Sequence, residues 1–281
     1  RQFAARLKFQ RHKSVIRQLK ALEAELGKQL LIRGVKGSRK VVLTEEGMIL
    51  RKRAEEMLAL MHKTEAEIRG SEEVITGNVF IGTGETEIVR MFARVAQELQ
   101  KTYPDIRYHI TSGNAEHVLE YLDKGLIDFG LIYTAADPKK YETLPVPLWD
   151  TWGVLMREDS PLAEKTAIAP EDLWDKPLIV SHQRGDDVPL NRWLGKKEEE
   201  LHIAATYNLV YNASLLVEEG LGYALCFDKL VNTNGRNLCF RPFATPLKAR
   251  CQIVWKRYQV FSKAASLFLQ RVRAELGDSQ N

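Results

Sequence analysis

The chain has 281 residues, of which 44% are hydrophobic and 28% charged, and its formal net charge is +4, which suits a substantial core in two or three domains. No stretch approaches the roughly 18 consecutive apolar residues of a membrane span, and no signal peptide is visible, so we expect a cytoplasmic protein without a membrane partner. The three cysteines have no C-x-x-C spacing and predict buried, reduced thiols.

The first forty residues are strongly basic. They hold twelve Lys or Arg against two Asp or Glu, a net charge of +10, so the rest of the chain carries −6. A basic block on one small folded unit is typical of a protein with a polyanionic partner, most often nucleic acid. We therefore expect this part of the chain to bind nucleic acid.

A helix is predicted within this block, over residues 10–26, which contain neither glycine nor proline. Val15, Leu19, Leu22 and Leu26 recur at helical spacing, and Gly27 is the expected C-terminal cap. The opposite face carries Arg and Gln, the side chains that pair bidentately with guanine and adenine edges in the major groove.

A short hairpin is predicted after the helix, from residues 30–33 and 41–43, with basic residues near its tip. A helix followed by a basic hairpin is a winged helix-turn-helix arrangement. The candidate DNA-binding residues of the helix and the hairpin are Gln10, Arg11, His12, Lys13, Ser14, Arg17, Gln18, Arg33, Lys36, Arg39 and Lys40.

A second helix is predicted over residues 43–68, where apolar and small residues alternate by four and three in a heptad seam. The seam residues are Leu43, Gly47, Leu50, Ala54, Met57, Met61, Thr64 and Ile68. One interpretation is an amphipathic helix packed on its own domain. We favour a dimer helix, because no adjacent helix in the sequence offers an obvious partner. Residues 70–77 are polar, so we predict a hinge at this segment.

From Asn78 onward, strands alternate with helices, which is typical of a doubly wound α/β domain. Strands are predicted at 79–81, 106–111 and 126–133, and helices at 87–102 and 115–124. Further elements follow at 152–156, 171–174, 177–181, 203–207, 213–219 and 223–227, then a strand at 248–258 and a helix at 262–276. Crossings near Trp149 and Arg250 predict two lobes joined by two strands. Lobe I is expected at 77–148 and 256–281, and lobe II at 149–255.

Four polar loops are candidate ligand sites, because ligands of open α/β sheets bind at the carboxyl ends of strands, beside helix N-termini. Their residues are Thr83, Gly84, Glu85, Thr86, Ser112, Gly113, Asn114, Ser181, His182, Gln183, Tyr207 and Asn208, with Tyr211 and Asn212 just before the helix predicted at 213. Each loop could equally be a helix cap. Glu85 disfavours a purely anionic ligand and would suit an ammonium or hydroxyl group.

Other site chemistries match the sequence poorly. Gly82-Thr83-Gly84 lacks the third glycine and the later acidic residue of a dinucleotide site, and no Gly-Lys-Ser/Thr phosphate loop exists. The six histidines show no zinc spacing. His182 could act as a base for Cys226, but the apolar run around Cys226 favours a buried thiol. We expect no catalytic residue, no metal and no cofactor other than a small-molecule ligand.

Residues 17–33 and 43–47 follow, in wording and order, the recognition helix, wing and linker-helix start of the LysR-type transcriptional regulators. The chain resembles this family over essentially its whole length. The resemblance implies a winged helix-turn-helix domain at 1–43 and a linker helix at 44–70 that pairs antiparallel with a second copy. It also implies an effector-binding domain at 77–281, built like a periplasmic binding protein, with its last helix returning to lobe I.

The resemblance further implies the partners. They are double-stranded promoter DNA, a small polar metabolite as effector, and copies of the chain in a dimer that assembles into a tetramer, with RNA polymerase as a further candidate. Effector binding would close the lobes and change how the dimers sit on DNA. The family has a further helix before this helix-turn-helix, of which residues 1–9 are at most a remnant. We therefore expect a DNA-binding domain incomplete at its N-terminus, through truncation or through residues outside the numbering.

Two alternatives from other classes share the two-lobed fold. A solute-binding protein that feeds a transporter needs neither a basic block nor a linker helix. An enzyme needs an acid–base or nucleophile pair, which the sequence does not offer. We therefore interpret the chain as a sequence-specific transcriptional regulator controlled by a small effector.

Overall fold

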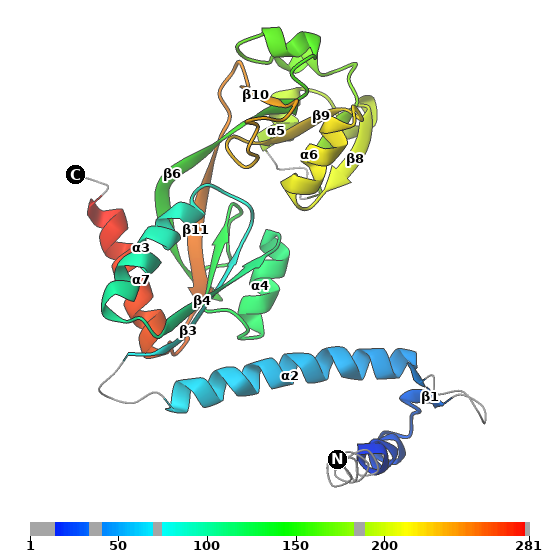
Figure 1. Ribbon diagram of the computed structural model, residues 1–281, viewed down its shortest axis with the longest axis vertical. Coiled ribbons are helices and arrows are strands. Elements are labelled where there is room, and N and C mark those ends of the chain that lie inside the picture. The colour runs from blue at the N-terminus through cyan, green and yellow to red at the C-terminus, as the bar shows by residue number, and fades with distance from the viewer. Residues whose placement is uncertain (1–14, 34–40, 70–74, 183–188, 279–281) are drawn as a thin grey trace. The chain divides into compact units, whose positions relative to one another are not determined.

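The computed structural model describes residues 15–33, 41–69, 75–182 and 189–278 (Figure 1). Contacts within the chain divide it into two compact units, residues 1–65 and 66–281. This division falls inside a helix, so the domain boundaries expected at 43, 70 and 77 stay predictions.

The first unit consists of a helix, a two-stranded sheet and a long second helix. Residues 15–26 are helical, and Gly27 ends the helix with a φ of +64°, a left-handed conformation that favours glycine. Strand β1 (Leu31–Arg33) pairs antiparallel with β2 (Val41–Leu43), which confirms the strands of the predicted hairpin. The hairpin tip lies outside the described residues. Helix α2 (Glu45–Arg69) follows directly.

The hairpin and α2 are joined at Leu30, which is buried. The Thr44 N–H donates to the Leu30 carbonyl at 3.0 Å. The Thr44 hydroxyl donates to the Gln29 carbonyl at 2.6 Å and accepts from the Gly47 N–H at 3.0 Å, which caps the first turn of α2. A Cβ atom on Gly47 would lie 2.1 Å from the Leu30 carbonyl oxygen. The seam glycine is therefore a packing requirement of this unit.

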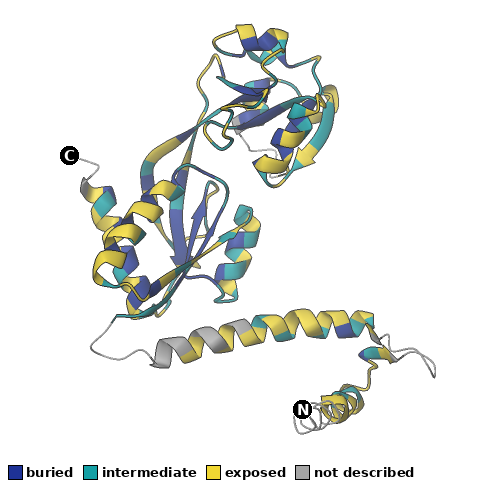
Figure 2. Ribbon diagram, viewed as in Figure 1, coloured by how far each residue is buried: buried dark blue, intermediate teal, exposed yellow. Residues whose placement is uncertain are grey.

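Most residues of α2 whose burial is described are exposed to solvent (Figure 2). The seam residues Met57 and Met61 are 61% and 46% exposed, and Met48 and Ile49 are also exposed. Charged neighbours form surface pairs such as Arg51 with Glu55. Large apolar side chains exposed along one helix are typical of a surface that another chain covers.

In the described part of the second unit, the strands form one nine-stranded sheet. The strands are β3 (Gly77–Thr83), β4 (Ile106–Ser112), β5 (Phe129–Ile132), β6 (Tyr141–Met156), β7 (Leu178–Ser181), β8 (Ile203–Tyr207), β9 (Tyr223–Phe227), β10 (Cys239–Pro242) and β11 (Lys248–Lys256). Their order in the sheet is β4-β3-β5-β11-β6-β9-β7-β8, and β10 pairs with β6.

Helices cover both faces of this sheet, as a doubly wound domain requires. They are α3 (Val89–Thr102), α4 (Ala115–Asp123), α5 (Pro189–Leu194), α6 (Val210–Glu218) and α7 (Lys263–Asp278), with short 3-10 turns η1 (Pro161–Glu164), η2 (Pro170–Asp172) and η3 (Glu198–Glu200). We call the part with β3 to β5, α3, α4 and α7 lobe I. The part with β7 to β10, α5 and α6 is lobe II (Figure 1).

Each lobe has a core on both sides of its strands. In lobe I, α3 and α7 pack on one face, where the Phe92 and Phe268 rings lie 5.7 Å apart, and α4 packs on the other through Val118 and Leu122. The return of the last helix to lobe I is therefore confirmed. In lobe II, α5 with the 3-10 turns and α6 form the two corresponding cores.

Two long antiparallel strands, β6 and β11, connect the lobes (Figure 1). Trp149 pairs with Arg250, and the register shifts between Arg250 and Gln252. This confirms the predicted crossing of two strands near these residues. The sequence predicted only residues 152–156 of β6, and the first half of the strand contains prolines, which are unusual in a paired strand.

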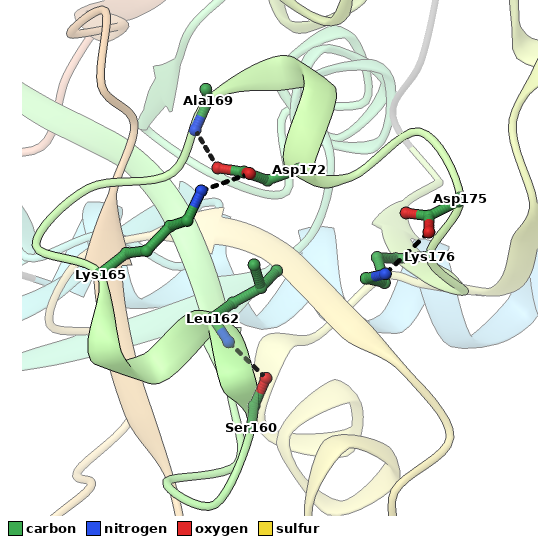
Figure 3. Close-up of polar contacts among 7 residues, drawn as sticks. All are labelled: Ser160, Leu162, Lys165, Ala169, Asp172, Asp175 and Lys176. Carbon is green, nitrogen blue, oxygen red and sulfur yellow. Dashed lines mark hydrogen bonds and ion pairs between the residues drawn. The ribbon is translucent and has the colours of Figure 1, made fainter.

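Side-chain caps shape the part of lobe II around η1 and η2 (Figure 3). The Ser160 hydroxyl accepts from the Leu162 N–H at 3.2 Å, and Asp172 accepts from the Ala169 N–H at 3.0 Å. Lys165 pairs with Asp172 at 2.5 Å and contributes to lowering the pKa of that carboxyl. These polar groups bond one another, so they have a structural role.

Candidate functional site

The predicted loops of lobe I lie side by side at the ends of β3 and β4. Thr83 pairs with Ser112 in parallel register, and the Gly113 N–H donates to the Thr83 carbonyl at 3.0 Å. Thr83 is 3% exposed and its hydroxyl donates to the Gly84 carbonyl at 2.8 Å, whereas Ser112 is exposed. Of these two hydroxyls, only that of Ser112 lies open to solvent.

Asn114 acts as a helix cap. Its side-chain oxygen accepts from the His117 N–H at 2.8 Å, at the first turn of α4. A Cβ atom on Gly113 would lie 2.5 Å from the His117 ring, so glycine is needed beside the cap. The capping interpretation is therefore correct for the Asn114 side chain.

The predicted loops of lobe II meet in the same way at the ends of β7 and β8. Ser181 pairs with Tyr207, and the His182 N–H donates to the Tyr207 carbonyl at 2.7 Å. His182 and Asn208 are exposed. Gln183 lies outside the described residues.

Tyr207 directs its hydroxyl into lobe II. The hydroxyl donates to the Leu225 carbonyl at 2.8 Å, and burial raises the pKa of Tyr207 well above its usual value. Helix α6 begins at Val210, so the predicted start at residue 213 was wrong, and Tyr211 and Asn212 lie inside its first turn. Tyr207 therefore supports a lobe II strand with its polar group.

Glu85 reaches from lobe I to lobe II. Its carboxylate oxygen Oε2 accepts a hydrogen bond from the backbone N–H of Val210, the first residue of α6. Helix α6 has no side-chain cap from its own N-cap residue, and a carboxylate is a favoured partner for free helix N–H groups. Burial raises the pKa of Glu85, and the bond from Val210 offsets part of that rise. Glu85 thus contacts a helix of the other lobe.

A second polar link lies where the strands leave lobe I. Asp150 on β6 is 4% exposed and accepts hydrogen bonds from the Thr86 hydroxyl at 2.7 Å and from the Tyr133 hydroxyl. Burial raises the pKa of Asp150 and that of Tyr133. Thr86 was predicted as a site residue, but Asp150 and Tyr133 were not. In the sequence, Asp150 could have been recognised as a single carboxylate within the apolar run around Trp149.

Aromatic side chains from both lobes meet near this link. The Tyr133 and Phe227 rings lie 5.1 Å apart, and Trp152 contacts Phe227 edge-on at 4.5 Å. Tyr133 follows β5 and Phe227 ends β9, so both occupy the carboxyl ends of strands. These are the sheet positions where ligands bind in open α/β folds.

The three cysteines are buried and free, which confirms the predicted burial of these thiols. Burial raises the pKa of Cys226 and of Cys251 to about 12. His182 is exposed while Cys226 is 2% exposed, which does not suit a base and nucleophile pair. Among the described residues, no cluster of His, Cys, Asp and Glu is arranged for a metal ion.

The described part of the basic block presents two predicted DNA-reading side chains. Arg17 and Gln18 are exposed on the helix at 15–26. Of the predicted apolar stripe, Leu19 and Leu22 are half-buried, whereas Val15 and Leu26 are each 50% exposed. The position of Arg33 at the end of β1 is described, but the predicted residues Gln10, Arg11, His12, Lys13, Ser14, Lys36, Arg39 and Lys40 lie outside the described residues.

Comparison with known protein families decides the family. The LysR substrate binding domain matches residues 72–277, which is well over half of the chain. The chain belongs to the LysR family. LysR regulators bind promoter DNA and small-molecule effectors, so the chain falls among transcriptional regulators and not among enzymes.

Curated transcriptional regulators are similar to part of the chain. An uncharacterized HTH-type transcriptional regulator of Bacillus subtilis, YvbU, is 28% identical over 74% of this chain and 69% of its own length. The hydrogen peroxide-inducible genes activator of Pectobacterium carotovorum is 25% identical over 67% and 62%. OxyR of Escherichia coli is 27% identical over 58% and 52%. The matches thus span between about half and about two thirds of these relatives.

Solved LysR structures share the fold. CbnR, a LysR family transcriptional regulator, has a TM-score of 0.72 at 17% identity, covering 94% of this chain and 89% of that chain. A putative LysR regulator of Pseudomonas aeruginosa has a TM-score of 0.58 at 22% identity, covering 94% and 89%. The effector-binding domain of QuiR, solved with shikimate, has a TM-score of 0.61 at 16% identity, covering 73% and 99%. None of the described helices is long and apolar enough to cross a bilayer.

Proposed function

We propose that this LysR protein binds double-stranded promoter DNA through residues 1–43 and responds to a small polar metabolite bound between lobes I and II. The observation that carries the proposal is the Glu85 bond to Val210, which brings the strand ends of one lobe to a helix N-terminus of the other. A ligand at such a place contacts both lobes. It can therefore favour one arrangement of the lobes over another.

The proposed effector contacts are the polar groups of the four loops. They are Thr83, Gly84, Glu85, Thr86, Ser112, Gly113, Asn114, Ser181, His182, Gln183, Tyr207 and Asn208. Asn114 and Tyr207 would contribute backbone groups, because their side chains bond within the protein. The protein would use no metal and no cofactor besides the effector.

The proposed assembly is a dimer formed through α2, which pairs further into a tetramer on DNA. The exposed apolar side chains of α2 support the dimer. The cytoplasm is the proposed location, and RNA polymerase is a further proposed partner. Effector binding would change the placement of the dimers and so the bending of DNA or the contact with polymerase.

Fluorescence anisotropy with DNA from upstream of the chain's own coding sequence tests DNA binding. With roughly six to ten phosphate contacts per dimer, affinity should fall by about three to five decades between about 50 and 200 mM salt. Arg17→Ala should relax sequence choice by ~1–3 kcal/mol if Arg17 contacts a base, because a bidentate base contact is lost. Arg271→Ala, an exposed arginine on α7, is the matched control.

Two results would contradict the proposal. A DNA affinity that does not change with salt concentration would exclude binding through the basic block. A thermal-shift screen in which no metabolite stabilises the protein would contradict the effector site, because a ligand at 100 times its Kd should add about 2.7 kcal/mol.

A further inference from the structure

Glu85 uses one of its two carboxylate oxygens within the protein. Oε2 accepts from the Val210 N–H, and Oε1 has no hydrogen-bond partner among the residues that the structure describes. The side chain is half-buried. Because an ionised carboxylate can accept about four hydrogen bonds, Oε1 is free to accept a further donor.

The helix end that would attract an anion is already occupied. A free helix N-terminus favours carboxylate and phosphate groups through its N–H groups and its dipole. At α6, the Glu85 carboxylate takes this place. An anionic effector at the same point would have to displace Glu85 or lie against its charge.

Further carboxylates lie close to Glu85. Burial raises the pKa of Cys226, and the charges of Asp228 and Glu85 raise it further. Asp150 is bonded to Thr86, the residue after Glu85. The Lys229 side chain, which follows β9, is exposed. The described surroundings of Glu85 therefore favour a positively charged group.

Aromatic rings complete this environment. Tyr133 donates to Asp150, and its ring contacts that of Phe227 of the other lobe in a tilted arrangement. The faces of aromatic rings attract ammonium groups, by about 0.5–2 kcal/mol according to how far the pair is desolvated. Carboxylates beside aromatic faces form an environment that recognises amines.

We infer that the site between the lobes selects an effector that carries an ammonium group, and that Glu85 is the residue that sets this preference. The inference rests on the proposed function, which locates the effector between the lobes. The ammonium donates to Oε1 of Glu85 while Oε2 stays bonded to Val210. One side chain then joins the effector to both lobes, so binding favours the joined arrangement.

Calorimetry with the full chain and probe pairs of opposite charge tests the inference. The pairs are L-phenylalaninamide with N-acetyl-L-phenylalanine, benzylamine with benzoate, and pentane-1,5-diamine with glutarate. At neutral pH, at least one amine should bind about tenfold or more tightly than its anionic partner, because a charge-assisted hydrogen bond to Glu85 is available only to the amine. Anions that bind as tightly as the amines, or no binding by any amine, would overturn the inference.

Glu85→Gln is the decisive variant, because it keeps an oxygen acceptor for Val210 and removes the charge. It should weaken amine binding by about tenfold and abolish the preference over anions. Glu98→Gln, which removes an exposed carboxylate from α3, should leave both unchanged. An unchanged preference in Glu85→Gln would overturn the inference.

The pH dependence of the unmodified protein gives a second readout that needs no variant. Burial raises the pKa of Glu85, so acidification protonates it early and should weaken amine binding. Amine affinity that stays constant as the pH falls from neutrality through the pKa of Glu85 would overturn the inference. DNA binding measured on the same samples distinguishes the two proposals, because a wrong effector charge leaves salt-dependent DNA binding intact.

Discussion

At the scale of single residues, Asp150 shows how a buried carboxylate can hold two elements together. It accepts from Thr86, in the loop after β3, and from Tyr133, after β5, and it lies on the strand that leaves lobe I. Both bonds stabilise the ionised form, yet burial is the larger effect and raises the pKa of Asp150. Ionising this carboxyl therefore costs stability, which is common at positions with a role in function.

The cost of ionising Asp150 predicts that the stability of the wild type relative to Asp150→Asn depends on pH. The variant keeps a carbonyl acceptor for Thr86 and Tyr133. The folded pKa lies above the unfolded value of about 3.9. The contribution of Asp150 to stability is therefore complete below that value and is lost as the pH rises through the folded pKa, by about 1.4 kcal/mol per unit of difference. Urea unfolding from about pH 4 to neutrality should show the wild type losing stability relative to the variant. If the stability difference between the wild type and the variant does not change with pH, or changes in the opposite direction, ionising Asp150 does not cost stability.

The cysteines support a second residue-scale prediction. Relatives named as activators of hydrogen peroxide-inducible genes match this chain, but peroxide reacts with exposed thiolates. All three cysteines are buried, and burial raises the pKa of Cys226 and Cys251 to about 12. The folded protein should therefore react slowly with a thiol reagent, show three thiols only after unfolding, and keep its DNA affinity in peroxide. A loss of DNA affinity in peroxide that Cys226→Ser prevents would contradict this prediction.

At the scale of elements, local patterns predicted most of the fold. Periodicity placed the strands β3, β4, β7, β8 and β9 and the helices α3, α4 and α7 near their observed bounds, because the pattern of buried residues along each element is visible within its own sequence. It failed at α6 and β6, where the deciding partner is distant. The cap of α6 is Glu85, 125 residues away, so the sequence around Asn212 suggested a later start.

The first half of β6 failed for a related reason. Pro145 and Pro147 argue against a strand, yet β6 includes both, and Pro145 pairs with Gln252 beside the register shift. Tertiary pairing with β11 therefore overrides local propensity here. The candidate site shows the same limit, since the sequence marked Thr86 but not its distant partners Asp150 and Tyr133.

The junction of the hairpin with α2 gives an element-scale prediction. A Cβ atom on Gly47 would lie 2.1 Å from the Leu30 carbonyl oxygen, so Gly47→Ala must displace the backbone. Overpacking of this kind costs about 1–3 kcal/mol, and it should loosen the first unit and weaken DNA binding. In α7, Gly277→Ala is the matched control, since a Cβ there meets nothing within 4 Å. Hydrogen exchange at residues 15–33 should rise only in Gly47→Ala. Equal protection in both variants would mean that the hairpin does not depend on this contact.

At the scale of the whole molecule, net charge of opposite sign lies on the basic block and on the rest of the chain. The basic block of +10 belongs to the first unit, and the rest of the chain, with −6, includes the lobes. This division keeps the attraction for DNA on one unit and limits contact between DNA and the lobes. In the proposed function, the lobes would then change arrangement while the first unit stays on DNA. Such coupling requires copies of the chain to be joined, and α2 offers the exposed surface for it.

Charges placed on the seam of α2 test whether this helix forms the dimer. Leu50→Glu combined with Met57→Glu puts carboxylates on the seam, where burial against a second copy would be costly. Light scattering should give a lower mass than for the wild type. DNA affinity should fall by about two decades or more, because the DNA-binding domain of one copy no longer tethers that of the other. Lys52→Glu, at an exposed position of the same helix, should leave the mass unchanged. If the double variant keeps the mass of the wild type, the seam packs within one chain, and the dimer must form through another surface.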